Sequence, residues 1–167
     1  WEKWADPNPN DFLAVRGRKT ECHNNAFWQL ELKLNDFQNL ELFEKTKETT
    51  ISSICSSKYF DEGHIARIDL LKYIESKNDS SINIHVFNQD NKHNFKHYKG
   101  PVSPYIDKSK GMLKYKYYFM IENNYEKDFI TEKIWEPILC ETLCFYWGCP
   151  NITEYIDQRA FIQLDMT

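Results

Sequence analysis

Residues 118–137 have the sequence YFMIENNYEKDFITEKIWEP, in which an apolar run ends in polar groups and a second apolar pattern opens with charges. The first part predicts a buried strand, and the second predicts a helix with Glu132 and Lys133 in its first turn. A helix N-terminus has free N–H groups and a partial positive charge, so it suits an anionic ligand. Glu122 and Asn123, at the end of the strand, add groups that bind hydroxyls. Together these residues predict a phosphate site beside a hydroxyl site, as a nucleotide sugar requires.

The composition is that of a folded domain without a general affinity for polyanions. The chain has 167 residues, 41% hydrophobic and 16% aromatic, which supports one domain with a substantial core and argues against disorder. Its formal net charge is −4, so it has no general attraction to nucleic acid or to anionic membranes. No apolar run reaches the roughly 18 residues of a transmembrane helix. Any anion site must therefore be local.

Cysteine usage favours a reducing compartment. The five cysteines are an odd number, and the first residues have neither an apolar signal core nor a starting Met. We therefore expect reduced thiols in a cytoplasmic protein of bacterial or viral origin, cut from a longer chain, with the Golgi lumen as the alternative for a eukaryotic source. Cys140 and Cys144 are four residues apart on an expected helix, but their neighbours are apolar. Burial as small hydrophobic residues is favoured over a zinc site.

Strand and helix patterns alternate from residue 49 onwards. Runs of β-branched and aromatic residues predict strands, and apolar residues three or four apart predict helices. Helix 63–76, for example, carries a stripe of Ile65, Ile68, Leu71 and Ile74. Such alternation predicts an α/β fold with a parallel sheet and helices on both faces. We expect strands at 49–55, 82–87, 115–121, 143–147 and 161–164, and helices at 63–76, at 131–141, where Pro137 should kink the helix or break its last turn, and at 151–157.

Parallel sheets bind ligands at the carboxyl ends of their strands, and polar clusters of this sequence fall there. Arg67 lies one turn into the first helix, where its planar guanidinium group can reach a diphosphate. The alternative is a surface arginine that pairs with Asp61 or Glu62. Glu122 and Asn123 follow the third strand, and the alternative to hydroxyl binding is a helix-capping or loop-stabilising role.

The next helix and the fourth strand complete the candidate site. Lys133, in the first turn of the helix, opposes the helix dipole, so we expect an anion to compensate for it. Thr131 or Asp128 is the expected N-cap. Trp147 and Gly148 lead into a tight turn at the end of the fourth strand, where they either form a pocket wall or belong to the core.

Motifs of other ligand classes are absent from the sequence. It has no Gly-x-Gly-x-x-Gly, no Gly-Lys-Ser/Thr loop and no Gly-x-Ser-x-Gly elbow, which argues against dinucleotide, P-loop and serine-nucleophile sites. An Asp-x-Asp metal motif is also absent. His93 and His97 are four residues apart, but they lie in an expected polar loop, so we expect no metal there.

A series of motifs from about residue 45 onwards resembles one known family. It comprises the Arg67 helix after a strand that ends in serine, and the segments 107–110 (DKSK), 115–123 (YKYYFMIEN), 130–133 (ITEK) and 146–150 (YWGCP). In this order and spacing the series is highly specific. It resembles the carboxyl-terminal, donor-binding domain of the inverting α-1,3/4-fucosyltransferases. The resemblance implies a GT-B architecture of two Rossmann-like domains, in which the second holds most of GDP-fucose. It also implies donor binding without a metal, although some relatives are stimulated by divalent ions.

The resemblance also implies roles for individual residues. Arg67 and Lys133 would grip the diphosphate with Asn123 beside them, and Glu122 and Glu132 would face ribose or sugar hydroxyls. Phe129 departs from the family, because many relatives have a tyrosine there whose hydroxyl bonds to the donor. The residues expected to bind the donor are thus Arg67, Glu122, Asn123, Thr131, Glu132, Lys133, Trp147 and Gly148, of which Arg67, Glu132 and Lys133 are expected to act in catalysis.

The resemblance places the general base outside the donor domain. In the family it is a carboxylate of the amino-terminal domain, and here only Glu2 and Glu21 are nearby candidates. We expect residues 1–48 to be the tail of that domain and the interdomain crossing, and 49–167 to be the donor domain, truncated at its C-terminal end. The expected reaction transfers fucose from GDP-fucose to a glycan hydroxyl with inversion. The alternatives are a nucleotide-sugar-binding fragment without turnover and a related enzyme that uses another nucleotide sugar.

Overall fold

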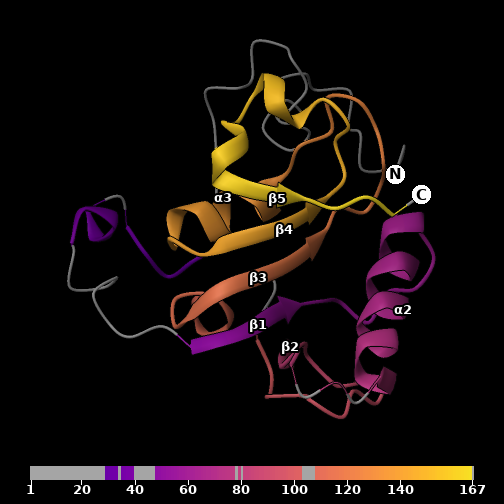
Figure 1. Ribbon diagram of the computed structural model, residues 1–167. Helices are drawn as coiled ribbons and strands as arrows, with labels where there is room; N and C mark the ends of the chain where they lie inside the picture. The colour runs from indigo at the N-terminus through magenta and orange to yellow at the C-terminus, as the bar shows by residue number, and fades with distance from the viewer. Residues whose placement is uncertain are drawn as a thin grey trace, which may run out of the picture.

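The computed structural model describes residues 29–33, 35–39, 48–77, 79, 81–102 and 108–166. Its centre is a five-stranded, all-parallel sheet with the order β2-β1-β3-β4-β5 (Figure 1). The predicted α/β fold is therefore confirmed. The strands are β1 (Glu48–Ile54), β2 (Ile84–Phe87), β3 (Tyr115–Ile121), β4 (Leu143–Trp147) and β5 (Phe161–Gln163), and the α-helices are α2 (Glu62–Lys77) and α3 (Glu132–Leu139). Short 3₁₀ turns are η3 (Asp36–Gln38), η5 (Ser109–Gly111), η6 (Ile152–Glu154) and η7 (Gln158–Ala160). Glu2, Glu21, Cys22 and Asp107 lie outside the described residues.

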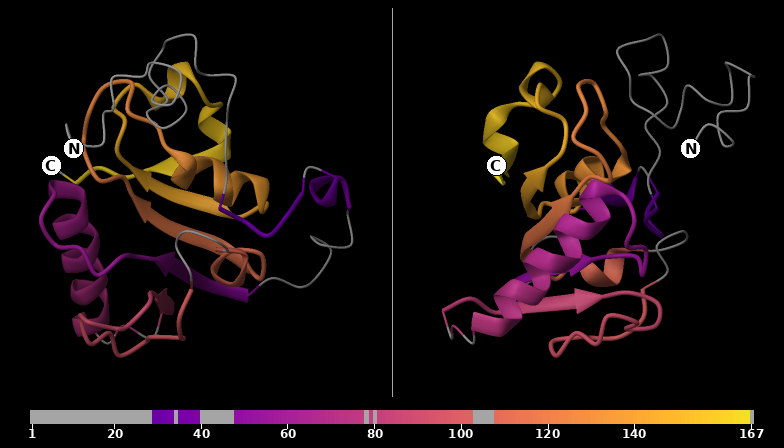
Figure 2. Two further views of the ribbon diagram at one scale, coloured as in Figure 1. Left: turned by 180° about the vertical axis from the view of Figure 1, so that it is seen from behind. Right: turned by 90° about the vertical axis from the view of Figure 1, so that its right-hand side faces the viewer.

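The alternation of side chains along the strands divides the core into two clusters. Neighbouring residues of a strand point to opposite faces of the sheet. In β3, Tyr118 joins the cluster that contains Ile134 of α3, whereas Phe119 joins the cluster that contains Leu71 of α2. One helix therefore covers each face, as the sequence predicts. The ribbon views show α2 beside the carboxyl ends of the strands and α3 on the other side of the sheet (Figures 1 and 2).

The buried side of α2 differs from the predicted apolar stripe. Ile68 and Leu71 are buried, but Ile65 and Ile74 are only half-buried. Part of the buried side of α2 is polar, because the helix lies at the strand ends, where Arg67 donates to the Ile121 carbonyl at 3.1 Å. The helix also buries His64 and Glu75.

Two predicted helices are shorter in the structure. The helix predicted at 131–141 ends at Leu139, two residues after Pro137, so the proline does break its last turn. The α-helix predicted at 151–157 is wrong, because this segment contains only the 3₁₀ turn η6, and a second turn, η7, begins just after it. Asp157 caps the second turn by accepting a hydrogen bond from the Arg159 N–H at 2.9 Å, which starts a new element in place of a continued helix. None of the helices that the structure describes is long and apolar enough to span a membrane.

The described residues 29–33 and 35–39 lie against the α3 side of the fold. Leu30 is buried in the same cluster as Ile134, and Phe37 packs against this cluster. The backbone of Gln29 is hydrogen-bonded to the domain on both sides, through its N–H and its carbonyl. This part of the segment 1–48 therefore contacts the sheet domain, while the domain boundary stays a prediction.

Gly63 allows the start of α2 to approach the end of β3. Its N–H donates to the Asn123 carbonyl at 2.9 Å, and a Cβ at this position would lie 1.7 Å from the Glu122 carbonyl oxygen. We expect Gly63→Ala to lower the free energy of unfolding by about 1–3 kcal/mol, because α2 must move away from β3. Urea denaturation measures this loss. Ser76→Ala, at an exposed position of α2, should change stability by less than about 0.5 kcal/mol. Equal effects of the two variants would argue against a tight contact at Gly63.

Candidate functional site

A cavity of about 160 Å³ lies at the carboxyl ends of β1 and β3, next to the starts of α2 and α3. Four residues that the sequence singles out, Arg67, Asn123, Glu132 and Lys133, line this cavity together. They come from three separate parts of the chain, which only the parallel sheet brings to one edge. The other lining residues are Gln29, Ile54, Ser56, Lys58, His64, Lys108, Tyr118 and Met120.

Arg67 is buried and bound to the end of β3. Its Nε donates to the Ile121 carbonyl at 3.1 Å, and its Nη2 donates to the same carbonyl and to Asn123 Oδ1 at 3.2 Å. Among the described residues Nη1 has no hydrogen-bond partner, so it is available to a ligand. Burial lowers the pKa of Arg67, but arginine begins so high that it stays charged. A surface pair with Asp61 or Glu62 is excluded, because Arg67 is only 5% exposed.

Lys133 lies between two carboxylates. Its Nζ is 3.4 Å from Glu122 Oε2 and 3.6 Å from Glu132 Oε1, and it donates to Thr131 Oγ1 at 2.9 Å. Burial alone would lower the pKa of Lys133, but the two carboxylates outweigh burial and raise it. The ammonium group is therefore a fixed positive charge at neutral pH. Thr131 is the N-cap of α3, one of the two residues predicted for that place.

Glu122 is fully buried and ties the β3–α3 loop to the strand end. Its carboxylate accepts the Thr131 N–H at 3.1 Å and the Thr131 hydroxyl at 2.8 Å. Gly148 closes over it, since a Cβ there would lie 2.5 Å from Glu122 Cγ. Neither Glu122 nor Thr131 lines the cavity. The structure therefore favours the loop-stabilising role that the sequence left open, and a contact between Glu122 and a donor hydroxyl would require this network to open.

Glu132 lines the cavity as an ionised acceptor. Its Oε1 is 3.2 Å from Lys108 Nζ and 3.6 Å from Lys133 Nζ. Burial would raise the pKa of Glu132, but Lys133 and Lys108 together lower it to about 2. A carboxylate with so low a pKa accepts hydrogen bonds from hydroxyls well and removes protons poorly at neutral pH.

The cavity is also lined by three charged or titratable residues for which the sequence predicts no role in binding. Lys108 is buried, with its Nζ 2.7 Å from Glu136 Oε2, whereas Lys58 is exposed. Burial and the nearby Arg67 lower the pKa of His64 to about 4, so this imidazole is neutral at pH 7. Lys58 follows the serines at the end of β1, and Lys108 belongs to the DKSK segment. Nothing in the sequence marks His64.

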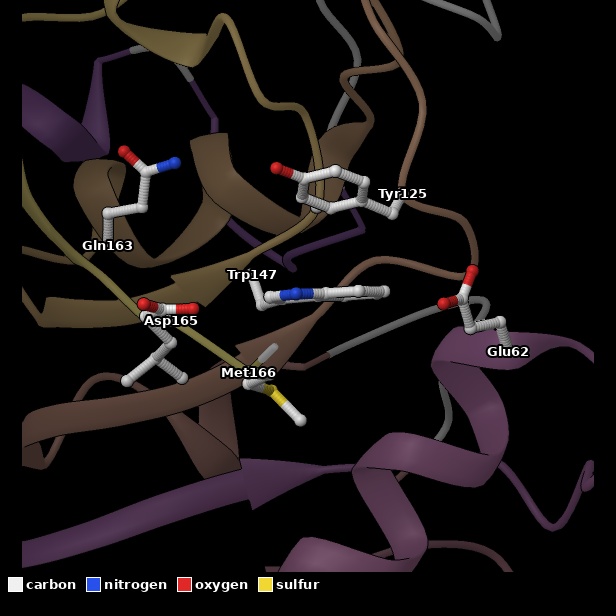
Figure 3. A pocket seen from close by; sticks show the side chains of 8 residues that line it. Glu62, Tyr125, Trp147, Gln163, Asp165 and Met166 are labelled. Carbon is white, nitrogen blue, oxygen red and sulfur yellow. The ribbon is translucent and has the colours of Figure 1, made fainter.

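Trp147 and Gly148 lie in a second cavity of about 390 Å³ near the carboxyl ends of β4 and β5 (Figure 3). The indole of Trp147 is stacked on Tyr125, with ring centroids 5.1 Å apart and an interplanar angle of 30°. The structure does not bring these two residues to the cavity of Arg67 and Lys133, and their contact with a donor stays a prediction. The second cavity is also lined by Glu62, Gln163, Leu164, Asp165 and Met166.

Within the part of the chain that the structure describes, no group of three or more His, Cys, Asp or Glu residues could hold a metal ion. Cys140 and Cys144 are fully buried, as predicted for small hydrophobic residues. His93 packs against Phe95 and its Nε2 is 3.1 Å from the Ser57 carbonyl oxygen, so its ring has a local role in the loop.

Three solved structures that are similar to this chain are described as α1,3-fucosyltransferases. A crystal structure of an α1,3-fucosyltransferase with GDP has a TM-score of 0.52 and 19% identity, over 71% of this chain and 31% of that chain. Structures described as α1,3-fucosyltransferase alone and with GDP-fucose have TM-scores of 0.49 and 0.48, at 19% and 18% identity, over 71% of this chain and 29% and 30% of theirs. The chain thus spans less than a third of the length of these structures. None of the curated proteins compared with the chain matches it.

A family model decides the assignment. The model described as glycosyltransferase family 10 (fucosyltransferase) C-term matches residues 44–166. This range contains the whole sheet, both α-helices and almost all of the residues that line the two cavities. The chain therefore belongs to glycosyltransferase family 10, the fucosyltransferases, and it contains the carboxyl-terminal part of the family's sequence.

Proposed function

We propose that the chain is the donor-binding part of a fucosyltransferase and that it binds GDP-fucose in the cavity of about 160 Å³. The carrying observation is a concentration of positive charge, because this small cavity is lined by Lys58, Arg67, Lys108 and Lys133. Lys108 is paired with Glu132 and Glu136, whereas Lys58, Arg67 and Lys133 lie beside a helix start, and these three cations, one of them with a planar fork of donors, suit a diphosphate. The similar fold of an α1,3-fucosyltransferase solved with GDP supports the guanine nucleotide.

In the proposed reaction, a hydroxyl of a glycan displaces GDP from fucose in one in-line step with inversion. Negative charge develops on the diphosphate as the bond to the sugar breaks. Arg67, Lys133 and the N-terminus of α3 would stabilise this charge and so take the part that a metal ion plays in other enzymes. The ionised Glu132 would accept hydrogen bonds from ribose or sugar hydroxyls and favour the positive charge on the sugar ring.

A second candidate function is binding without turnover by this chain alone. A general base needs a pKa near the working pH, whereas the pKa of Glu132 is about 2. Among the described residues that line this cavity, His64 is the side chain whose ordinary pKa is near neutrality, but its pKa here is about 4. Glu132 and His64 are therefore both weak bases at neutral pH. Glu2 and Glu21 lie outside the described residues and stay unassigned. We infer that the described residues hold the donor and that the base comes from elsewhere.

Calorimetric titration of the chain with GDP, GDP-fucose, GDP-mannose and UDP-galactose tests the proposed site and the donor sugar. We expect both GDP and GDP-fucose to bind, and Lys133→Ala to weaken this binding by roughly 30-fold or more, because the diphosphate loses a desolvated cation. Lys127→Ala, an exposed lysine of the preceding loop, is the matched control and should leave affinity unchanged.

Three outcomes of this titration separate the alternatives. If no guanine nucleotide binds, the proposed function is wrong. Preference for another nucleotide sugar would assign a different donor. Transfer or hydrolysis of GDP-fucose by the chain itself would refute binding without turnover.

The proposed setting is the cytoplasm, with a glycan as the second substrate. Cysteines outside disulfides are stable in a reducing compartment, and the buried Cys55, Cys144 and Cys149 form no disulfide with any described residue. This agrees with the cytoplasmic location expected from the sequence.

A further inference from the structure

Lys108 lies inside a row of alternating charges at the start of α3. Its Nζ is 2.7 Å from Glu136 Oε2 and 3.2 Å from Glu132 Oε1, and Glu132 in turn lies 3.6 Å from Lys133 Nζ. We propose that Lys108 is a positioning residue, which holds the Glu132 carboxylate in the cavity as the acceptor for the ribose hydroxyls of the bound nucleotide. This inference rests on the proposed binding of a guanine nucleotide.

The backbone of Lys108 is fixed on both sides. Its N–H donates to the Gln29 carbonyl at 2.9 Å, and its own carbonyl accepts the Gly111 N–H at 3.0 Å. Gly111 is bound to the sheet, because its carbonyl accepts the Ser52 hydroxyl of β1 at 2.6 Å. A Cβ on Gly111 would lie 2.7 Å from the side chain of Ile54, so η5 sits close against β1. The lysine therefore extends from a rigid base.

Glu136 anchors the far side of the Lys108 ammonium group. It is fully buried, and its Oε1 accepts the Gln29 N–H at 2.6 Å while its Oε2 faces Lys108. Both oxygens are thus engaged, and burial raises the pKa of Glu136 although Lys108 opposes this. Because Glu136 cannot turn away without losing two contacts, it fixes the position of the lysine between the two carboxylates.

Glu132 and Glu136 are one helical turn apart, so their side chains lie on one face of α3 and repel each other. Lys108 bridges them. The groups that act on Glu132 are Lys108 and Lys133 at its carboxylate, with Arg67 and Glu136 further away. Without Lys108, Glu132 would be repelled by Glu136 and drawn towards Lys133, where it would compete with the diphosphate instead of facing the ribose.

The test compares GDP with 2′,3′-dideoxy-GDP, which lacks the ribose hydroxyls. We expect the unmodified chain to bind GDP about tenfold more tightly, the size of a hydrogen bond to a charged acceptor. In Lys108→Met this preference should disappear, and it should also disappear in Glu132→Ala. The double variant should show no further change in the ratio, because both substitutions remove one interaction. Lys110→Met, an exposed lysine two residues away, should keep the tenfold preference.

A merely structural or phosphate-binding role of Lys108 gives a different result. It would weaken GDP, dideoxy-GDP and inorganic pyrophosphate together and leave the ratio of the two nucleotides unchanged, which would overturn the inference. Equal binding of both nucleotides by the unmodified chain would also overturn it, while leaving GDP binding intact. Failure of the unmodified chain to bind GDP at all would instead refute the proposed function.

A second variant protects the test against misfolding. Lys108→Met leaves the buried Glu136 without its cation, which can destabilise the fold. Lys108→Met combined with Glu136→Gln removes both charges and leaves an amide oxygen to accept the Gln29 N–H. The affinities of this double variant for GDP and for dideoxy-GDP are compared in the same way. If the double variant no longer prefers GDP, the inference is supported, and if it keeps the tenfold preference, the inference is overturned.

Discussion

Glu122→Ala is expected to lower the free energy of unfolding by about 3–5 kcal/mol, the cost of removing one partner from a buried charge pair. Glu122 is fully buried and holds the Thr131 N–H, the Thr131 hydroxyl and, at 3.4 Å, the Lys133 ammonium group. Its loss leaves the start of α3 without these hydrogen bonds and creates a cavity beneath Gly148. Urea denaturation followed by tryptophan fluorescence measures the effect.

Two further substitutions define what Glu122 does. Glu126→Ala, at an exposed position of the same loop, should change stability by less than about 0.5 kcal/mol. Glu122→Gln keeps the size of the side chain and one acceptor oxygen, so it should cost less than Glu122→Ala. If Glu122→Ala were as stable as the unmodified chain, the carboxylate would be free to bind a donor hydroxyl, which is one of the two roles that the sequence left open.

The second large effect is expected at Arg67, which is 5% exposed and holds both Ile121 and Asn123 through one guanidinium group. Arg67→Ala should weaken GDP binding by roughly 100-fold or more, because a desolvated cation is lost and Asn123 is released. Isothermal titration calorimetry with GDP measures the dissociation constants of the variant and of the unmodified chain. The loss should exceed that of Lys133→Ala, since Lys133 has a side chain that is 21% exposed.

Arg67→Lys separates the charge from the shape of the guanidinium group. Lysine restores a positive charge but not the planar fork, so it cannot bond to the Ile121 carbonyl and to a phosphate in the same geometry. We therefore expect it to recover only a small part of the affinity. Arg159→Ala removes an arginine whose side chain is 90% exposed and should have no effect. Full recovery by lysine would mean that Arg67 acts through charge alone.

The strands could be predicted closely because their signal is local. The segments 115–121 and 143–147 are rich in aromatic and apolar residues, with Lys116 as the one charged residue, and both match the observed strands β3 and β4 at each end. The segment 151–157 lacks such a signal. The spacing of its apolar residues fits a helix, but Asp157 caps a separate turn by accepting a hydrogen bond from the Arg159 N–H. The periodicity of apolar residues does not reveal such a cap.

The residue types that meet at the strand ends of the candidate site could be predicted from the sequence. Arg67, Asn123, Glu132 and Lys133 follow predictable elements of a parallel sheet, so their approach to one cavity followed from the order of those elements. Lys108 could not be found in this way, because its partners Glu132 and Glu136 lie 24 and 28 residues away and contact it only after η5 docks on β1.

The face of the sheet on which each side chain lies depends on contacts between segments that are distant in the sequence. Trp147 ends a strand as expected, but successive residues of a strand alternate between faces, and Trp147 points to the α2 side while Tyr146 points to the α3 side. The cavity of Arg67 is lined instead by Tyr118 and Met120 of the α3 side. Glu122 was likewise placed by packing, since Gly148 closes over it and Thr131 holds it. Local sequence patterns determine the strands and helices and where they end. Contacts between distant segments determine which polar groups face a ligand and which are hydrogen-bonded within the protein.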